Sequence, residues 1–314
     1  MPLVAAALTA FAALLLGQAI AQRRFVPWDS WAALQQLNYY LFLPALFFSS
    51  LSTIDLVNLR LLAPGLAVAA TMLVGSLLVA LWRWRPGVNQ ALTPALLEAA
   101  LRANMPLGFG LAYILFKGQV GLQFMALAGL FYLPSVILIG AYISQGCTGV
   151  DRGRFSRLGF LTQAGRLFRR NPILIAALLG LAFNATGLRL HPALAALLLI
   201  FGAAAIPLGI LAAGAAMNTR TLRQVMGAQP REIAVVTLLK LVALPVVAGA
   251  LAWALGLQGI TAKAVVLLAA LPCVAPRFSV AAPPGSAPPV LNAAATATTL
   301  LWVVTLPLAL WILT

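Results

Sequence analysis

Long apolar segments constrain the fold of this chain more than any other feature. Of its 314 residues, 63% belong to the hydrophobic set and 8% are charged, whereas soluble domains are roughly 45–50% apolar. Backbone polar groups inside a bilayer must be hydrogen-bonded within the protein, which leaves helices or closed barrels. The apolar runs lack the period-2 alternation of barrel strands. We therefore expect an all-α polytopic membrane protein.

A transmembrane helix needs about 20 mostly apolar residues, and the chain has room for ten such helices. We place them at residues 2–21, 34–53, 61–82, 92–116, 120–144, 172–188, 193–217, 232–256, 260–282 and 290–313. The first could pass for a secretory signal. Its cations, Arg23 and Arg24, follow the apolar run, however, so we expect a retained helix whose N-terminus lies outside.

The charges support one orientation of these helices. The 20 Lys and Arg residues outnumber the 5 acids, and most of the cations fall in loops that are cytoplasmic if the N-terminus is outside. Both termini are then outside and the central loop is cytoplasmic, and we expect the inner (plasma) membrane of a bacterium. Since the cations act as topology determinants, we expect the lipid bilayer and no nucleic acid as a partner.

The longest polar stretch divides the chain near its middle. Residues 148–171 form a short basic cytoplasmic linker between a first five-helix repeat, 1–147, and a second, 172–314. With an odd number of helices in each, a homologous second repeat must be inverted, as in many secondary transporters. Prolines recur in matching helices of both halves: Pro44, Pro64, Pro106 and Pro134, then Pro207, Pro245, Pro272 and Pro307. Unrelated kinks are the alternative, because proline is common in transmembrane helices.

The fourth and ninth helices hold the candidate substrate site. Pro106 with Gly108 and Gly110, and Pro272 with Pro276, are expected to break these helices. Broken intramembrane helices are tolerated where they line a cavity, and the N-termini of the half-helices can offer N–H groups to an anion. Two ordinary kinks are the competing interpretation.

Polar side chains near the breaks complete this candidate site. Asn104 can both donate to a carboxylate and accept from a protonated ligand, although an interhelical hydrogen bond would also explain it. Arg102 and Arg277 can attract anions from the cytoplasm or extend to headgroups, and Asn38 lies in a neighbouring helix. Lys240 is expected either to snorkel toward the cytoplasm or to face the protein interior.

The sequence offers few residues for a metal site, a disulfide or an enzyme active site. One histidine, His191, and two cysteines, Cys147 and Cys273, provide neither a His-based metal site nor a disulfide framework. No nucleophile has a base beside it. Glu98 is the single acid near the membrane interior, which weakens ion coupling without excluding it. We expect no enzyme, no metal and no cofactor.

Three motifs resemble those of the auxin efflux carrier family and its bacterial permease relatives. Asn38-Tyr-Tyr-Leu-Phe-Leu-Pro44-Ala resembles the second-helix signature of that family, Pro207-Leu-Gly-Ile-Leu-Ala-Ala-Gly214 its seventh-helix pattern, and Thr305-Leu-Pro-Leu its ending. The resemblance implies a fold related to the bile acid/sodium symporters. Such a fold has crossed, unwound fourth and ninth helices, a scaffold domain and a moving transport domain, and it carries small organic anions such as auxin or dicarboxylates.

The resemblance also assigns individual residues. The family's fourth-helix asparagine falls on Asn104, the glycine after its crossover on Gly118, and its ninth-helix proline on Pro272. Structural or hinge positions fall on Pro44, Gly118, Pro207, Gly214 and Gly285. The chain departs from the family where Pro283 and Pro284 must shorten or distort the second half of the ninth helix.

These observations predict a secondary transporter that moves small organic anions by alternating access. A sodium-coupled symporter of the bile acid type is the alternative within transport. A non-transporting membrane sensor or scaffold is the alternative from another class. A homodimer is the candidate assembly.

Overall fold

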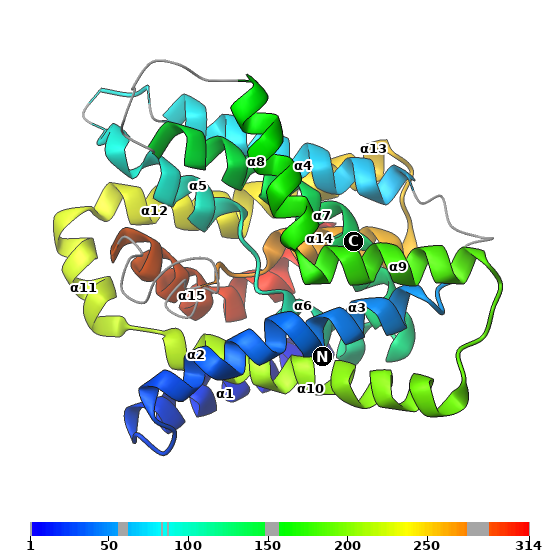
Figure 1. The fold of residues 1–314 in the computed structure, drawn as a ribbon. Coiled ribbons are helices and arrows are strands. Elements are labelled where there is room, and N and C mark those ends of the chain that lie inside the picture. Colours follow the sequence, from blue (N-terminus) through cyan, green and yellow to red (C-terminus); the bar gives the residue numbers. More distant parts are fainter. Residues whose placement is uncertain are drawn as a thin grey trace.

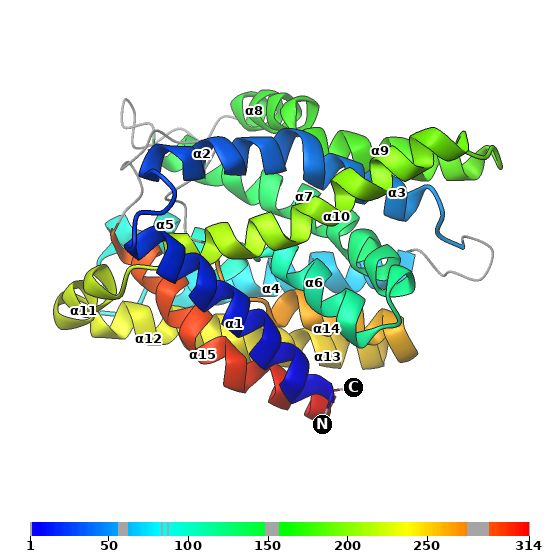
Figure 2. The ribbon, with the colours of Figure 1, turned by 90° about the horizontal axis from the view of Figure 1, so that it is seen from below.

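The fold is all-helical, as expected. The structure, a computed structural model, describes residues 2–55, 62–82, 84–86, 88–147, 157–274 and 289–313, and it contains no strand within them. Figures 1 and 2 show the helices packed side by side, and Figure 2 shows the start of α1 and the end of α15 at the same end of the molecule. The apolar composition therefore folds as intramembrane segments must, with its backbone hydrogen bonds inside helices.

Six helices in the described residues are long and apolar enough to cross a membrane. They are α1 (Pro2–Gln22), α4 (Leu62–Trp82), α7 (Gln119–Cys147), α10 (Pro192–Ala216), α15 (Pro289–Leu313) and the composite of α12 (Pro230–Leu238), a π-turn (Leu239–Ala243) and α13 (Leu244–Ala254).

The other predicted spans correspond to shorter or interrupted helices. The second is α2 (Trp28–Leu37), a π-turn (Asn38–Phe42) and α3 (Leu43–Leu51), and the fourth is α5 (Thr93–Leu101) followed by α6 (Met105–Leu115). The sixth is α9 (Pro172–Ala185), and the ninth begins with α14 (Gly259–Ala270). A short 3-10 turn, Gln90–Leu92, leads into α5.

Two amphipathic helices lie where the sequence predicted only polar connections. The helix α8 (Arg157–Arg170) occupies much of the expected linker 148–171, and α11 (Thr219–Ala228) follows α10. In α8, Ala164, Leu167 and Phe168 are buried or partly buried, whereas Arg166, Arg169 and Arg170 are exposed. A basic amphipathic helix of this kind lies along a membrane surface, so the polar composition concealed a helix.

Both π-turns end two residues before a proline, Pro44 in the second span and Pro245 in the eighth. Leu43 N–H donates to the Asn38 carbonyl five residues earlier, and the eighth span repeats this geometry. A proline has no N–H and crowds the carbonyl four residues before it, so a wider turn relieves the helix. These turns hold Asn38 and Lys240.

The contact between α1 and α10 depends on small residues. A Cβ added to Gly214 would overlap the backbone of Leu14, and one added to Gly17 would overlap the backbone of Leu211. The ends of both helices lie on the same side of the molecule, since Gln22 and Ala215 line one pocket, so α1 and α10 run in the same direction and cross at these glycines. Close backbone approach of this kind supplies the van der Waals contact that holds helices together in lipid.

Candidate functional site

The fourth span is broken, but at a different point from the one predicted. The helix α5 ends at Leu101, Arg102 is extended with φ −66° and ψ 138°, and α6 starts after Asn104. Pro106 occupies the second position of α6, where an N–H would have no intrahelical acceptor. The break therefore precedes the proline and does not follow from a lost hydrogen bond inside the helix.

The two glycines expected to weaken this helix lie inside α6 and have another role. A Cβ at Gly108 would come within 2.5 Å of the Met125 side chain and 2.6 Å of Leu271, the first residue of the ninth-span break. A Cβ at Gly110 would meet Ile206 of α10 at 3.0 Å. The glycines thus let neighbouring segments approach α6 and do not interrupt it.

In the ninth span, by contrast, the helix ends at the predicted place. The helix α14 ends at Ala270, and Leu271 is extended with φ −63° and ψ 142°. Beyond Pro272, the Cys273 N–H donates to Thr298 Oγ1 of α15 at 3.2 Å. Three predicted residues of this region, Pro276, Arg277 and Gly285, lie outside the described residues.

The two breaks meet directly. Asn104 N–H donates to the Pro272 carbonyl at 3.1 Å, and Asn104 is 2% exposed. Its Oδ1 accepts from Leu107 N–H at 3.3 Å and caps α6. We call the segments Arg102–Asn104 and Leu271–Val274 together the crossing. One predicted residue from each break thus joins the two halves of the chain.

Asn38 lies beside the crossing. A Cβ at Gly209 of α10 would overlap the Pro106 ring and come within 3.0 Å of Asn38 Nδ2. Asn38 Nδ2 donates to the Ala205 carbonyl at 3.3 Å, while its Oδ1 is buried without a donor among the described residues. The π-turn therefore presents an unused acceptor next to the first turn of α6.

Arg102 is half-buried and belongs to the same region. It interacts electrostatically with the phenols of Tyr39 and Tyr132 and with Cys273 of the ninth-span break. Tyr132 in turn accepts a hydrogen bond from Ala103 N–H at 2.7 Å. The guanidinium thus places positive charge near the crossing.

Most backbone donors of the fourth-span break are already in use, which corrects the expectation of a half-helix end open to an anion. The N–H groups of Ala103 and Asn104 make the bonds just given, Leu107 N–H is taken by the Asn104 side chain, and Pro106 has none. A ligand here therefore depends chiefly on side chains.

Lys240 was not among the residues assigned to the site. It is 0% exposed, its Nζ has no hydrogen-bond partner in the described part of the chain, and it interacts electrostatically with Cys273. Of the two predicted alternatives, the structure thus has the side chain facing the interior. The signal in the sequence was a lone lysine within an apolar run.

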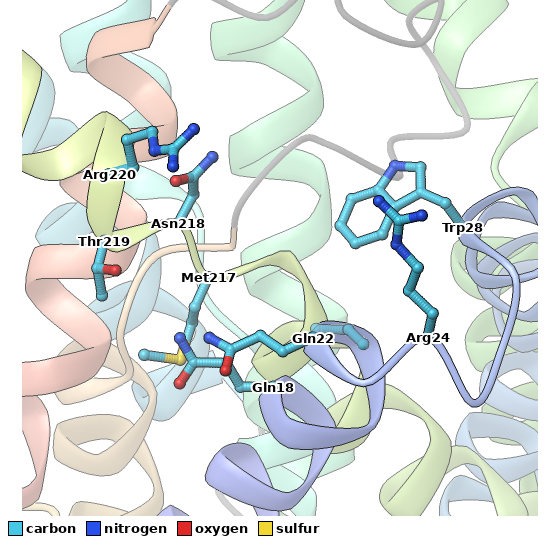
Figure 3. Close-up of a pocket in the computed structure, with 10 residues that line it drawn as sticks. Gln18, Gln22, Arg24, Trp28, Met217, Asn218, Thr219 and Arg220 are labelled. Atoms are coloured by element: carbon cyan, nitrogen blue, oxygen red, sulfur yellow. The ribbon is translucent and has the colours of Figure 1, made fainter.

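Two pockets lie away from the crossing. The first, of about 520 Å³, lies between the end of α1 and the start of α11 and has Arg24 and Arg220 in its lining (Figure 3). The second, of about 250 Å³, has Thr53, Gln119 and Leu190 in its lining. Each pocket joins loops that the predicted orientation assigns to one side of the membrane, cytoplasmic for the first and outside for the second.

The structure also shows the local geometry at three predicted structural positions, Gly118, Pro207 and Pro44. Gly118 has φ +64° and follows Lys117, with φ +64°, in the turn that ends α6, where its N–H donates to the Tyr113 carbonyl at 2.9 Å. This is the geometry of a Schellman cap, and it suits glycine. Pro207 lies inside α10, and Pro44 follows a π-turn.

Comparison with known families bears on the second half of the chain. Residues 157–312 match the model of a family described as "Membrane transport protein", the domain of the auxin efflux carriers. The match extends from α8 to α15 and includes Lys240 and the start of the ninth-span break. No curated protein matches the chain. The family resemblance in the sequence is therefore confirmed.

Proposed function

We propose that this chain, which through residues 157–312 belongs to the membrane transport protein family, is a secondary transporter that moves small organic anions by alternating access. One observation carries the proposal: the hydrogen bond from Asn104 N–H to the Pro272 carbonyl joins two helix breaks. Breaks inside a membrane are costly, and they are tolerated where irregular backbone lines a path for a substrate.

The helix contacts support the expected division into a scaffold and a moving domain. The helices α1, α2, α3, α9 and α10 pack mainly on one another. The helices α4 to α7 pack among themselves and with α12 to α15, and α6 also packs against α1 and α10. We call these the first and second helix groups. The crossing lies within the second group and faces the first through α6 and α10. Movement of one group against the other would expose the crossing alternately to the two sides.

The proposed architecture is ten membrane-spanning segments in two inverted five-helix repeats. The breaks in the fourth and ninth segments occupy matching places in the two halves, which favours the repeat. The start of α1 and the end of α15 lie at the same end of the molecule, which is consistent with an even number of crossings (Figure 2). The cytoplasmic and outside loops that line the two pockets agree with this orientation.

The charges near the crossing favour an anion. Two cations, Lys240 and Arg102, and one acid, Glu98, lie in the neighbourhood of Cys273 in the ninth-span break. The balance is positive, and Asn104 Nδ2 adds a hydrogen-bond donor that a carboxylate can use. We infer that small carboxylates bind between the two breaks.

The decisive experiment is flux of labelled carboxylates into proteoliposomes, with protein-free liposomes as the control. We expect saturable uptake of at least one mono- or dicarboxylate. Uptake that disappears when sodium is replaced by choline would establish the sodium-coupled alternative. Stabilisation of the purified protein by a carboxylate, without flux, would establish the sensor. Neither flux nor stabilisation across a broad panel would refute an anion function.

A further inference from the structure

We propose that Lys240 is the charged anchor that receives the carboxylate of the transported anion beside the crossing. This inference rests on the proposed function, because it assigns the cationic part of that same site. Neither the sequence motifs nor the family match gives this lysine a role. It is argued from its depth, its lack of a partner and its neighbours.

Lys240 lies deep in the membrane-spanning part of the chain. It is in the π-turn of the composite helix Pro230–Ala254, which has 25 residues. At about 1.5 Å of rise per residue it is roughly 15 Å from the start of that helix. Since the side chain is fully buried, its ammonium does not reach a membrane surface.

A buried ammonium without a partner needs a reason. Unpaired charges in a low-dielectric interior are costly, and intramembrane lysines are normally paired or line an aqueous path. In the described residues no oxygen accepts a hydrogen bond from Lys240 Nζ. As far as the described residues go, the three donors of this group are thus left for a molecule that is not part of the chain.

The neighbours of Lys240 place it at the site. Its π-turn packs against α5 and α14, the two helices that lead into the breaks, and against α15. Lys240 also lies in the neighbourhood of Cys273, which follows Pro272 in the ninth-span break. The backbone donors of the fourth-span break are largely committed to internal bonds, so a carboxylate there requires a cationic side chain.

Thr237 supplies a second unused polar group on the same helix face. It lies three residues before Lys240, a spacing that brings side chains together on a helix. Its buried Oγ1 has no partner in the described chain, whereas Thr71 and Thr299 donate to carbonyls of their own helices. A hydroxyl and an ammonium therefore face one interior position, where both can donate to the same carboxylate.

The test is Lys240→Met, a substitution of similar size that removes the charge. The probes are succinate and indole-3-acetate, and the readouts are thermal stabilisation of the purified protein and uptake into proteoliposomes. Lys263→Met is the matched control, because Lys263 lies near the start of α14, away from the break.

We expect the wild-type protein and Lys263→Met to respond alike to at least one probe. We expect Lys240→Met without a probe to be at least as stable as the wild type, because a buried charge without a partner does not stabilise the fold. Its affinity for the probe should fall by about tenfold or more, the range for a hydrogen bond to a charged group. Lys240→Arg, which keeps the charge, should retain part of the affinity.

Each contrary result has a distinct meaning. Undiminished affinity in Lys240→Met would overturn the assignment of Lys240 and leave the transport proposal standing. Loss of the fold in both Lys240→Met and Lys240→Gln would show that the ammonium has an internal structural role, which also overturns the assignment. Absence of any response in the wild-type protein would overturn both proposals.

Discussion

Replacing Asn104 by serine should separate its two roles, capping a helix and binding an anion. Its Oδ1 accepts from Leu107 N–H and caps α6, whereas its Nδ2 group is a donor that a carboxylate can use. Serine caps a helix about as well as asparagine, but alanine costs about 1 kcal/mol at such a position. We therefore expect Asn104→Ser to keep the stability of the wild type and Asn104→Ala to lose about 1 kcal/mol.

Anion binding should follow a different order from stability. Both substitutions remove the Nδ2 donor, and a hydrogen bond to a charged group contributes about 1.5–3 kcal/mol, or roughly tenfold to 150-fold in affinity. Asn104→Ser and Asn104→Ala should thus lose affinity for succinate or indole-3-acetate to a similar degree. Thermal unfolding with and without these ligands measures both quantities on the same samples.

Asn171 provides a matched control at another helix start. Its Oδ1 accepts from Leu174 N–H at 3.0 Å and caps α9, far along the chain from either break. Asn171→Ala should lose about the same stability as Asn104→Ala and keep full ligand affinity. If Asn104→Ser binds the anion as well as the wild type, the amide is not a ligand and the site has been placed wrongly.

Three further substitutions test the packing around the crossing by thermal unfolding. Gly209→Ala should destabilise by about 1–3 kcal/mol through overpacking, whereas Gly140→Ala, with nothing within 4 Å of the added Cβ, should be neutral or stabilising; equal stability of the two would contradict the α6–α10 contact. Tyr132→Phe leaves the buried Ala103 N–H without its acceptor and should cost about 1–3 kcal/mol; an unchanged midpoint would show that this bond does not hold the break. Gly118→Ala forces a side chain to φ +64° and should cost roughly 1–2 kcal/mol, a loss that a wild-type melting curve would rule out.

The sequence was sufficient for the apolar architecture and for the region of each break, although the break in the fourth span precedes the residues that predicted it. Membrane helices can be recognised in a sequence by their length and hydropathy. The long helices therefore agree with their predicted bounds to within a few residues. The breaks were predicted from Pro106 and Pro272, and each lies within four residues of its proline. Proline marks these places because it excludes the ordinary interior of a helix.

The partners of each residue could not be read from the sequence. Nothing in the order of residues shows that Gly209 faces Pro106, or that the backbone N–H of Asn104 donates to the Pro272 carbonyl. The π-turn before Pro245 depends on how a helix absorbs a missing N–H, and it decides which way Lys240 points. Packing between segments far apart in the sequence determines these features, and rules based on local sequence patterns carry no information about such packing.

The hydrogen bonds around the crossing also indicate which parts can move together. Those that hold its backbone join Ala103 to Tyr132, Asn104 to Pro272 and Cys273 to Thr298, and all three lie within the second helix group. Toward the first group, the Pro106 ring packs on a glycine of α10, and Gly110 lies against Ile206 of the same helix.

We call the packed contact between α6 and α10 the seam. The two helices can slide along it without breaking the three hydrogen bonds that hold the crossing together. If α10 slides past α6 during transport, a side chain at Gly209 should slow uptake more than it weakens ligand binding. A disulfide between cysteines placed at Gly110 and Ile206 should stop uptake and leave binding in place, because it fixes the seam and spares the crossing. Full transport by the crosslinked protein would show that this seam does not move.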